Sequence, residues 1–164
     1  MDFKLASFST SIAQKQAENE IVKCNELTAD YGLVLTSRQA VELVETRSFA
    51  LGANGRIEFG GGVIDKIIKE FCDSPYISMS NYADTIHELI KIFYYYKNET
   101  LDLLSDDDLI EFMKESFNGI CRGSMELLEE RELEKMANNL RYGRDLYYSN
   151  DEMGENKVEE DEYE

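Results

Sequence analysis

Residues 81–99, "NYADTIHELIKIFYYYKNE", hold the longest uninterrupted helical pattern in the chain. Their apolar residues recur every three or four positions, which is the spacing of one face of an α-helix. These residues are Tyr82, Ile86, Leu89, Phe93 and Tyr96. Asn81, or Ser80 before it, is a residue type that begins helices as an N-cap. The stretch therefore predicts a long amphipathic helix that packs one face into a core.

Three consecutive tyrosines, Tyr94, Tyr95 and Tyr96, lie near the end of this helix. Successive helical residues are rotated by about 100°, so the three rings cannot share one face. Since Tyr96 belongs to the buried stripe, we expect Tyr94 or Tyr95 to be partly exposed. Exposed tyrosines are typical of interfaces, which makes Tyr94 and Tyr95 a candidate interaction surface. The alternative is a tyrosine at the rim of the core whose hydroxyl group faces water.

Helical spacing continues on both sides of this stretch. It predicts further helices over residues 13–31, 36–51, 62–72, 105–117 and 124–140. Thr36 and Gln39 fit a capping box at the start of the second helix. The buried stripe predicted for that helix consists of Ala40, Val41, Val44, Ser48 and Leu51. Ser105 and Ser124 are the expected N-caps of the last two helices.

The fold class follows from these patterns. A single proline among 164 residues fits long helices better than a β-sandwich with many turns. We therefore predict an all-α, single-domain bundle of five or six helices. Two short extended pieces, "LVLT" at 33–36 and "RIEF" at 56–59, are candidates to pair as a tiny two-stranded ribbon.

The two ends of the chain lack a helical pattern. Residues 1–10 are rich in serine and threonine and predict a loose lead-in, so the helical domain is expected over 11–148. Residues 149–164 carry a net charge of −7 without apolar periodicity and predict a disordered acidic tail. This leaves a net charge of −10, out of the total of −17, for the remainder.

The net charge of −17 limits the classes of partner. It repels nucleic-acid backbones and anionic membrane surfaces, so we expect a protein partner, for which a basic protein fits best. No run reaches the roughly 18 apolar residues of a membrane span, and no secretory signal pattern is visible. Cys24, Cys72 and Cys121 are odd in number and far apart, which is typical of reduced thiols and predicts a cytoplasmic location.

The glycine-rich stretch "NGRIEFGGGVIDKI", residues 54–67, leads into a predicted helix. Backbone N–H groups at a helix N-terminus bind anions, and an arginine lies nearby as a second ligand. The residues of this candidate anion site are Arg56, Gly60, Gly61 and Gly62. A phosphate-binding loop places lysine and a hydroxyl residue after its last glycine, whereas Val63 and Ile64 follow here. We therefore predict a packing elbow and keep the anion site as the alternative.

Catalytic and metal-binding patterns are weak. His87 is the only histidine, so any histidine-based catalytic pair has to use it, but an ordinary boundary histidine is the simpler interpretation. The acids at 106–108 are consecutive, unlike the alternating ligands of a calcium loop, and they complement the dipole of a helix that begins there. We predict no catalytic residue, no cofactor and no metal.

Three blocks of the sequence resemble a known family. They are "ETRSFALGANGRIEFGGG" at 45–62, "FCDSPYI" at 71–77 and the segment 81–119. Over about residues 33–122 the chain resembles a functionally uncharacterised family of small acidic proteins from Gram-positive anaerobic bacteria. The resemblance implies a single bacterial cytoplasmic domain and assigns no catalytic residues.

Three functional hypotheses remain. The first is a non-enzymatic protein–protein interaction module. The second is a DNA-mimicking inhibitor of a nucleic-acid-binding protein, which requires carboxylates in ordered rows on the helices. The third is a small-anion binder or enzyme that uses the turn at 60–62. The oligomeric state and the identity of the partner are left open.

Overall fold

A computed structural model describes residues 2–58 and 60–143, and for residues 2–11 it describes the backbone only. The helices with eight or more residues are α1 (Asp2–Lys23), α3 (Ser37–Ala53), α4 (Gly62–Phe71), α5 (Tyr82–Glu99), α6 (Asp106–Asn118) and α8 (Glu134–Arg141). Shorter pieces are α2 (Asn25–Thr28), the 3-10 helix η1 (Ala29–Tyr31), α7 (Met125–Leu127) and the π-helix η2 (Leu128–Leu133). The described residues contain no strand, which confirms the all-α prediction.

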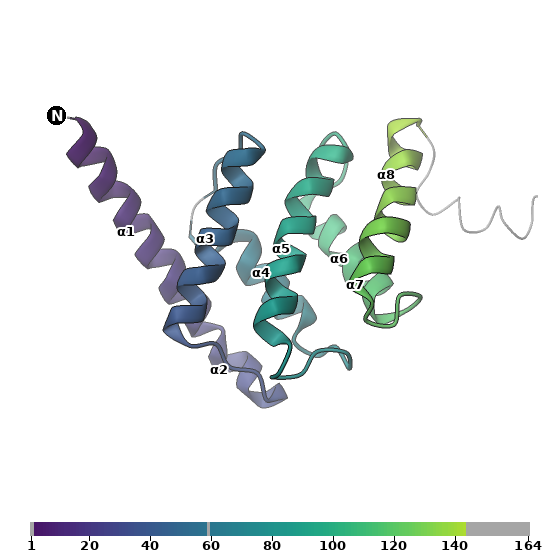
Figure 1. Cartoon of the computed structure of the whole chain (residues 1–164), viewed down its shortest axis with the longest axis horizontal. Coiled ribbons are helices and arrows are strands. Elements are labelled where there is room, and N and C mark those ends of the chain that lie inside the picture. Colours follow the sequence, from purple (N-terminus) through teal and green to yellow (C-terminus); the bar gives the residue numbers. More distant parts are fainter. Residues whose placement is uncertain (1, 59, 144–164) are drawn as a thin grey trace, which may run out of the picture.

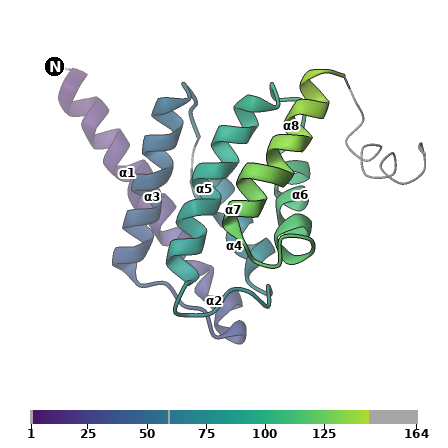
Figure 2. The same cartoon turned by 45° about the vertical axis from the view of Figure 1, so that its right-hand side comes forward.

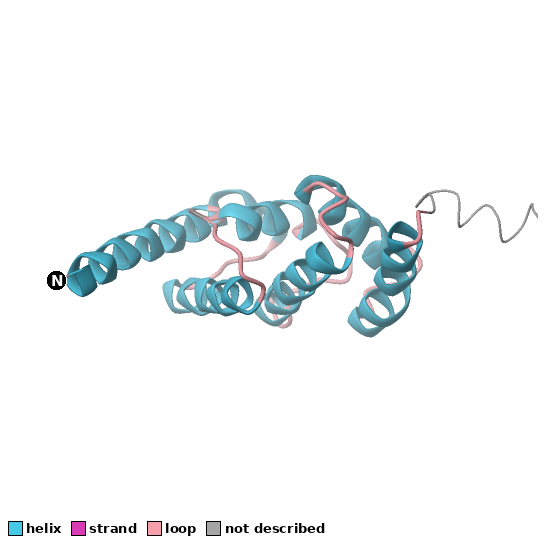
Figure 3. Cartoon of the chain, turned by 90° about the horizontal axis from the view of Figure 1, so that it is seen from above, coloured by secondary structure: helices cyan, strands magenta, loops and turns pink. Residues whose placement is uncertain are grey.

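The helices form two layers. Helices α3, α5 and α8 lie side by side in one layer, and α1, α4 and α6 lie behind them (Figures 1 and 3). Within the layers α3 packs on α5 and α4 packs on α6, while α1 packs on α3 and α4 on α5 across the layers. The chain alternates in direction, so it forms three antiparallel helix pairs stacked side by side, as in short α-solenoids. This structural repetition has no counterpart in a sequence repeat.

The alternation gathers the loops at two opposite edges. The loop residues 54–58 and 60–61, the loop 100–105 and the end of α8 lie at the upper edge of Figure 1, and loops 32–36, 72–81 and 119–124 lie at the lower edge. Figure 2 shows the same arrangement after a 45° turn. Since loops join the helix pairs at these edges, residues distant in sequence become neighbours there.

Helix α5 lies at the centre of the stack. It contacts α3, α4, α6 and α8, and nine of its eighteen residues are buried. Every residue of the predicted stripe is among them: Tyr82, Ile86, Leu89, Phe93 and Tyr96. Full burial of such side chains contributes roughly 1.5–3 kcal/mol each, so this helix contributes much of the core. None of the described helices is long and apolar enough to cross a membrane.

Most predicted caps are present. The Thr36 hydroxyl accepts from the Gln39 N–H in a full capping box, and Ser105 and Ser124 accept from N–H groups three residues on. Asn81 stands at the N-cap position of α5, but its side chain makes no cap hydrogen bond, so that part of the prediction is wrong. Its carboxamide instead accepts from the Ser78 N–H and donates to the Tyr76 carbonyl, because the preceding loop needs both groups.

Two other predictions are wrong in detail. Helix α1 begins at Asp2, so residues 2–10 are helical and not a loose lead-in. Extending a helix that is already nucleated fixes one residue per hydrogen bond gained, which favours the continuation of α1 through residues 2–10. The described residues of 33–36 and 56–59 form no ribbon. Met1, Phe59 and the predicted acidic tail at 149–164 lie outside the described residues.

The buried stripe of α3 is rotated from its predicted position. Leu43 and Arg47 are buried in place of Val41 and Ser48. Helix α3 is contacted by α1 on one side and α5 on the other, so its buried face is wider and differently centred than a single stripe. The burial of Arg47 is the feature of this helix that its sequence pattern does not predict.

Candidate functional site

The three glycines at 60–62 form a bend against helix α1. Gly60 and Gly62 have φ angles of +62° and +46°, in the left-handed region that favours glycine. The Gly61 N–H donates to the Glu20 carboxylate at 2.5 Å. A Cβ on Gly62 would lie 2.7 Å from Glu58 Oε1, so no larger residue fits without movement. Conformation and close packing thus account for the glycines.

Glu58 supplies a second carboxylate at the N-terminus of α4. Its Oε1 accepts the Tyr94 hydroxyl at 2.5 Å and lies 3.3 Å from Arg47 Nη1 and 3.4 Å from the Val63 nitrogen. We call Arg47, Glu58 and Tyr94 the Glu58 cluster. A helix N-terminus attracts negative charge, and here Glu58 and Glu20 provide it from within the chain. The place that an external phosphate would need is therefore occupied by the chain's own carboxylates.

The Glu58 cluster is largely removed from water. Arg47 is 5% exposed, and its Nε has no hydrogen-bond partner among residues 2–58 and 60–143. Burial, and the hydrogen bond to Glu58, raise the pKa of Tyr94 far above its usual value. Sequence reasoning missed Arg47, Glu58 and Glu20, because an arginine and two glutamates in an acidic chain carry no local sign of burial.

Arg56 does not join the glycines. Its Nη2 lies 2.7 Å from Asp102 Oδ1, and its Nε and Nη2 donate to Asn98 Oδ1 at 2.9 and 2.7 Å. These partners lie at the end of α5 and in the following loop. The predicted combination of Arg56 with Gly60, Gly61 and Gly62 is therefore not assembled, since this arginine serves to link two loops.

The two candidate tyrosines lie in different environments. Tyr95 is 50% exposed and remains a surface residue. Tyr94 is 2% exposed, and its hydroxyl points into the Glu58 cluster. The prediction of Tyr94 as a surface residue is therefore wrong, because the partly buried Glu58 carboxylate gives its hydroxyl an internal partner.

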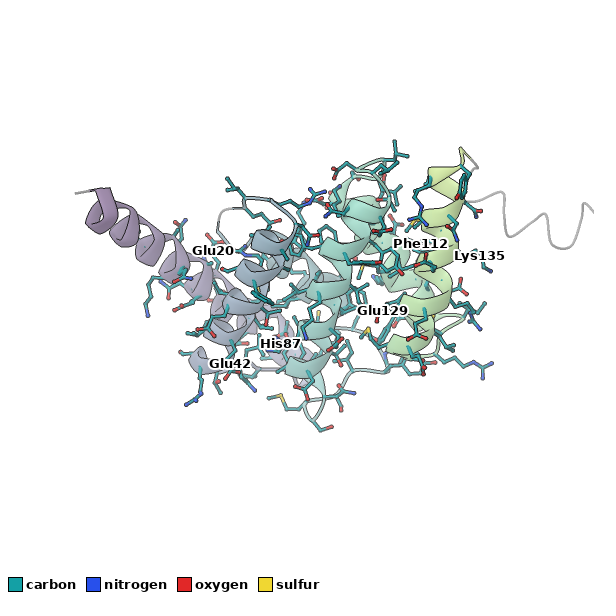
Figure 4. The ribbon with its side chains drawn as sticks, turned by 45° about the horizontal axis from the view of Figure 1, so that its top comes forward. Glu20, Glu42, His87, Phe112, Glu129 and Lys135 are labelled. Carbon is teal, nitrogen blue, oxygen red and sulfur yellow. The ribbon has the colours of Figure 1, made fainter. Side chains whose placement is uncertain are left out.

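Tyr96 explains an irregularity in the last helix. Its hydroxyl lies 2.8 Å from the Glu129 carbonyl oxygen and 2.7 Å from Glu134 Oε1. Glu129 belongs to the π-helix η2, where wider hydrogen bonding changes the partners of the carbonyl groups. Burial, with Glu88 and Glu130 nearby, raises the pKa of Glu129, which Figure 4 labels. The π-helix thus has a packing explanation.

His87 meets a threonine and not a cysteine or serine. Thr46 Oγ1 lies 2.7 Å from His87 Nδ1 and joins α3 to α5, and burial lowers the pKa of the imidazole. Figure 4 shows Glu42 on the same side of the molecule. A nucleophile–base pair needs a third group that orients the base, and no hydrogen bond in the described part of the chain supplies one. The pair is a contact between two helices.

The cysteines are free and buried. The Cys24 Sγ lies 2.8 Å from Asp65 Oδ1, and burial together with this hydrogen bond raises the pKa of Cys24 to about 12. The group is therefore a thiol near neutral pH and a poor nucleophile. Among the described residues, no group of three or more histidine, cysteine, aspartate or glutamate side chains is placed to hold a metal ion.

Exposed apolar side chains gather around the Arg56–Asp102 ion pair. Ile57, next to Arg56, is 81% exposed, and Leu101 and Leu103, on either side of Asp102, are 62% and 60% exposed. We call these three residues the apolar loop cluster. Beside it lies a pocket of about 300 Å³. Its lining includes apolar Leu51 and Phe93 and charged Lys97 and Asp106.

One family model matches the chain. Its description is "Family of unknown function (DUF6323)", and the match covers residues 20–146. It includes all of α3, α4, α5, α6 and α8, so it takes in both the Glu58 cluster and the apolar loop cluster. No curated protein and no solved structure matches the chain.

Proposed function

Because the chain belongs to a family of unknown function (DUF6323), its role has to be inferred from its own surface, and we propose that it is a non-enzymatic protein–protein interaction module. One support is the state of the α4 N-terminus. Glu20 and Glu58 already satisfy it, which favours a structural use of the glycine turn. We therefore propose that the outer surface carries the function.

The observation that carries the proposal is the apolar loop cluster. Single exposed apolar residues are ordinary on protein surfaces. Ile57, Leu101 and Leu103, however, come from two different loops and flank one ion pair. They also lie beside a pocket whose lining combines apolar Leu51 and Phe93 with charged side chains. Exposed apolar side chains next to charged ones are common at binding surfaces.

The architecture and composition fit the same role. Stacked helix pairs offer extended surfaces for binding. The net charge of −17 favours a basic protein as the partner. Three free buried thiols suit a reducing compartment, so we place the protein in the cytoplasm, and the resemblance of its sequence suggests a Gram-positive anaerobic bacterium.

The test compares two double variants in a complex reconstituted from the purified full chain and a partner identified by crosslinking in cells. The double variant Ile57→Ser/Leu103→Ser alters the apolar loop cluster. The matched control Met79→Ser/Ile120→Ser removes side chains that are 49% and 62% exposed at the opposite edge. We expect the first to weaken binding at least tenfold and the second to change it less than twofold. Equal effects of both variants, or no effect of the first, would overturn the proposal.

A further inference from the structure

The pocket beside the apolar loop cluster has a balanced set of charges. Its volume is about 300 Å³, at the lower end of the range for small-molecule sites. Its charged lining consists of Arg56 and Glu58 from the loop after α3, Lys97 from α5 and Asp106 at the start of α6. Two positive and two negative side chains therefore line one hollow, although the whole chain carries a net charge of −17. We call this hollow the mixed-charge pocket.

These side chains already have partners within the chain, but the pairing uses only part of their hydrogen-bonding capacity. Lys97 Nζ donates to the Leu104 carbonyl and lies 2.9 Å from Asp106 Oδ1, which leaves a third N–H of the lysine and the second oxygen of the aspartate. Arg56 donates through Nε and Nη2, and its Nη1 has no acceptor among residues 2–58 and 60–143. Glu58 accepts through Oε1, and no described residue donates to its Oε2. Charged donors and acceptors therefore remain for a ligand.

The same groups are shielded from water. The side chain of Lys97 is 11% exposed, that of Glu58 is 21% exposed and that of Arg56 is 25% exposed. The buried aromatic residues Phe93 and Tyr94 also line the pocket. Hydrogen bonds between charged groups are stronger in such a setting than on the open surface.

The loop between Lys97 and Asp106 has a fixed backbone. Leu101 and Asp102 have φ angles of +57° and +59°, in the left-handed region. The Asp102 N–H donates to the Lys97 carbonyl at 3.1 Å, and the buried Thr100 donates its hydroxyl to the carbonyl of the same residue at 3.2 Å. Residues held in disfavoured conformations are concentrated at ligand clamps and other functional sites. A fixed loop holds Lys97 and Asp106 in place before a ligand binds, which lowers the entropic cost of binding.

The balance of charge discriminates between classes of ligand. Phosphate would meet Glu58 and Asp106, and a metal ion would meet Arg56 and Lys97, so half of the pocket opposes each of them. A zwitterion offers a carboxylate to the two cations and an ammonium group to the two carboxylates. The apolar part of the lining provides contact area for an aliphatic group. These elements together match a small amino acid and not a simple ion.

We propose that the mixed-charge pocket binds a free α-amino acid with an aliphatic side chain. The carboxylate of the ligand pairs with Arg56 and Lys97, and its ammonium group pairs with the two carboxylates of the pocket. Its side chain lies against Leu51 and Phe93. This inference goes beyond the proposed function, because it adds a small-molecule site next to the interaction surface.

The first test varies the ligand and uses the purified full chain. L-Leucine at millimolar concentration is the probe, and NMR chemical-shift changes measure its affinity and locate its site. Acetyl-L-leucine lacks the ammonium group, and L-leucinamide lacks the carboxylate. We expect leucine to shift residues 56–58, 93–97 and 106, and both analogues to bind at least tenfold more weakly. The absence of shifts with leucine would overturn the proposal. Equal binding of leucinamide would overturn it in favour of a peptide N-terminus, and equal binding of acetyl-leucine in favour of a simple carboxylate.

The second test varies the pocket. Asp106→Asn removes one carboxylate from the lining, and Asp107→Asn, at the next position, is the matched control because Asp107 pairs with Lys66 instead. Arg56→Gln is compared with Arg38→Gln, whose arginine is 89% exposed on α3. We expect the two pocket variants to weaken leucine binding at least fivefold and the two controls to change it less than twofold. Equal effects of pocket and control variants would overturn the site. If a pocket variant loses its helical circular dichroism, the comparison of leucine with its analogues on the wild-type chain still decides.

Discussion

Tyr94 donates its hydroxyl hydrogen to Glu58 Oε1 at 2.5 Å, although the two residues are 36 positions apart in the sequence. The same carboxylate oxygen lies 3.3 Å from Arg47 Nη1. The contact ties the loop after α3 to the central helix α5. Glu58 also lies at the N-terminus of α4, where its negative charge complements the helix dipole together with that of Glu20.

Removing this anion should destabilise the fold. In Glu58→Ala the buried Arg47 loses its ion-pair partner, and losing one member of a buried pair costs about 3 kcal/mol or more in the free energy of unfolding. Millimolar formate should then raise the thermal midpoint of Glu58→Ala more than that of the wild type, because formate binds the vacated carboxylate site only in the folded state. Chemical denaturation measures the loss, with the exposed Glu42→Ala as the control. A Glu58→Ala protein as stable as the wild type would contradict the assignment.

The glycines should differ in their tolerance of a methyl group. Gly62→Ala combines a positive φ with a Cβ only 2.7 Å from Glu58 Oε1, so we expect a loss of about 1–3 kcal/mol. Gly52→Ala, inside α3 and with open space around its Cβ, should gain about 0.5–1 kcal/mol. Thermal or urea unfolding of both variants provides the comparison. The same sign for both would show that the turn is less constrained than its geometry indicates.

External anions should not stabilise the wild-type chain. Since Glu20 and Glu58 already satisfy the α4 N-terminus, millimolar phosphate or ATP should leave the thermal midpoint unchanged. Scans with and without each anion at matched ionic strength make the test. A rise of several degrees in the wild type would restore the small-anion hypothesis for the turn.

Relieving the left-handed leucine should increase stability. Leu101→Asn removes part of a backbone cost of about 1–2 kcal/mol and exposes little that was buried, so we expect a gain of up to about 1 kcal/mol. Leu109→Asn, at a fully buried position of α6, is the matched contrast and should be strongly destabilising. Equilibrium unfolding in urea distinguishes them. A loss of stability in Leu101→Asn would mean that the leucine itself supports the turn.

The stability should fall in weak acid partly through His87. Burial lowers the pKa of His87 in the folded chain below its ordinary value of about 6.5, so protonation favours the unfolded chain. The contribution of His87 is present above pH 6.5 or so and is lost as the pH falls through the folded pKa, while nearby Glu42 opposes the shift. His87→Gln should flatten the curve of stability against pH between about 7 and 5. An unchanged curve would show that carboxylates alone cause the slope.

Local patterns explain why most helices were predictable. The apolar spacing that the sequence shows in α5 matches the buried face in the structure. An apolar face has to be buried whichever element packs against it. The caps at Thr36, Ser105 and Ser124 act within three residues, so their signal is complete in the sequence. Asn81 failed as a side-chain cap because its carboxamide had competing partners in the loop before it.

The candidate site could not be predicted in the same way. Arg47, Glu58 and Tyr94 come from α3, a loop and α5, and nothing near any one of them in sequence indicates the others. The predicted grouping of Arg56 with the glycines was wrong for the same reason, since its partners Asn98 and Asp102 lie more than 40 residues away in the sequence. The glycines at 60–62 could be interpreted from the sequence, because conformational freedom is a property of the glycine residue itself.

By itself the sequence determined that the chain is all-α and carries a net charge of −17, because helical periodicity, capping and charge are properties of the residues and their near neighbours. Tertiary structure alone decided how the helices pair in two layers, which charges are buried, and which loops share an edge. Packing brings Arg56 against Asp102 in the turn after α5 and turns Tyr94 inward to Glu58. Such contacts depend on the relative placement of whole helices, which short-range patterns do not encode.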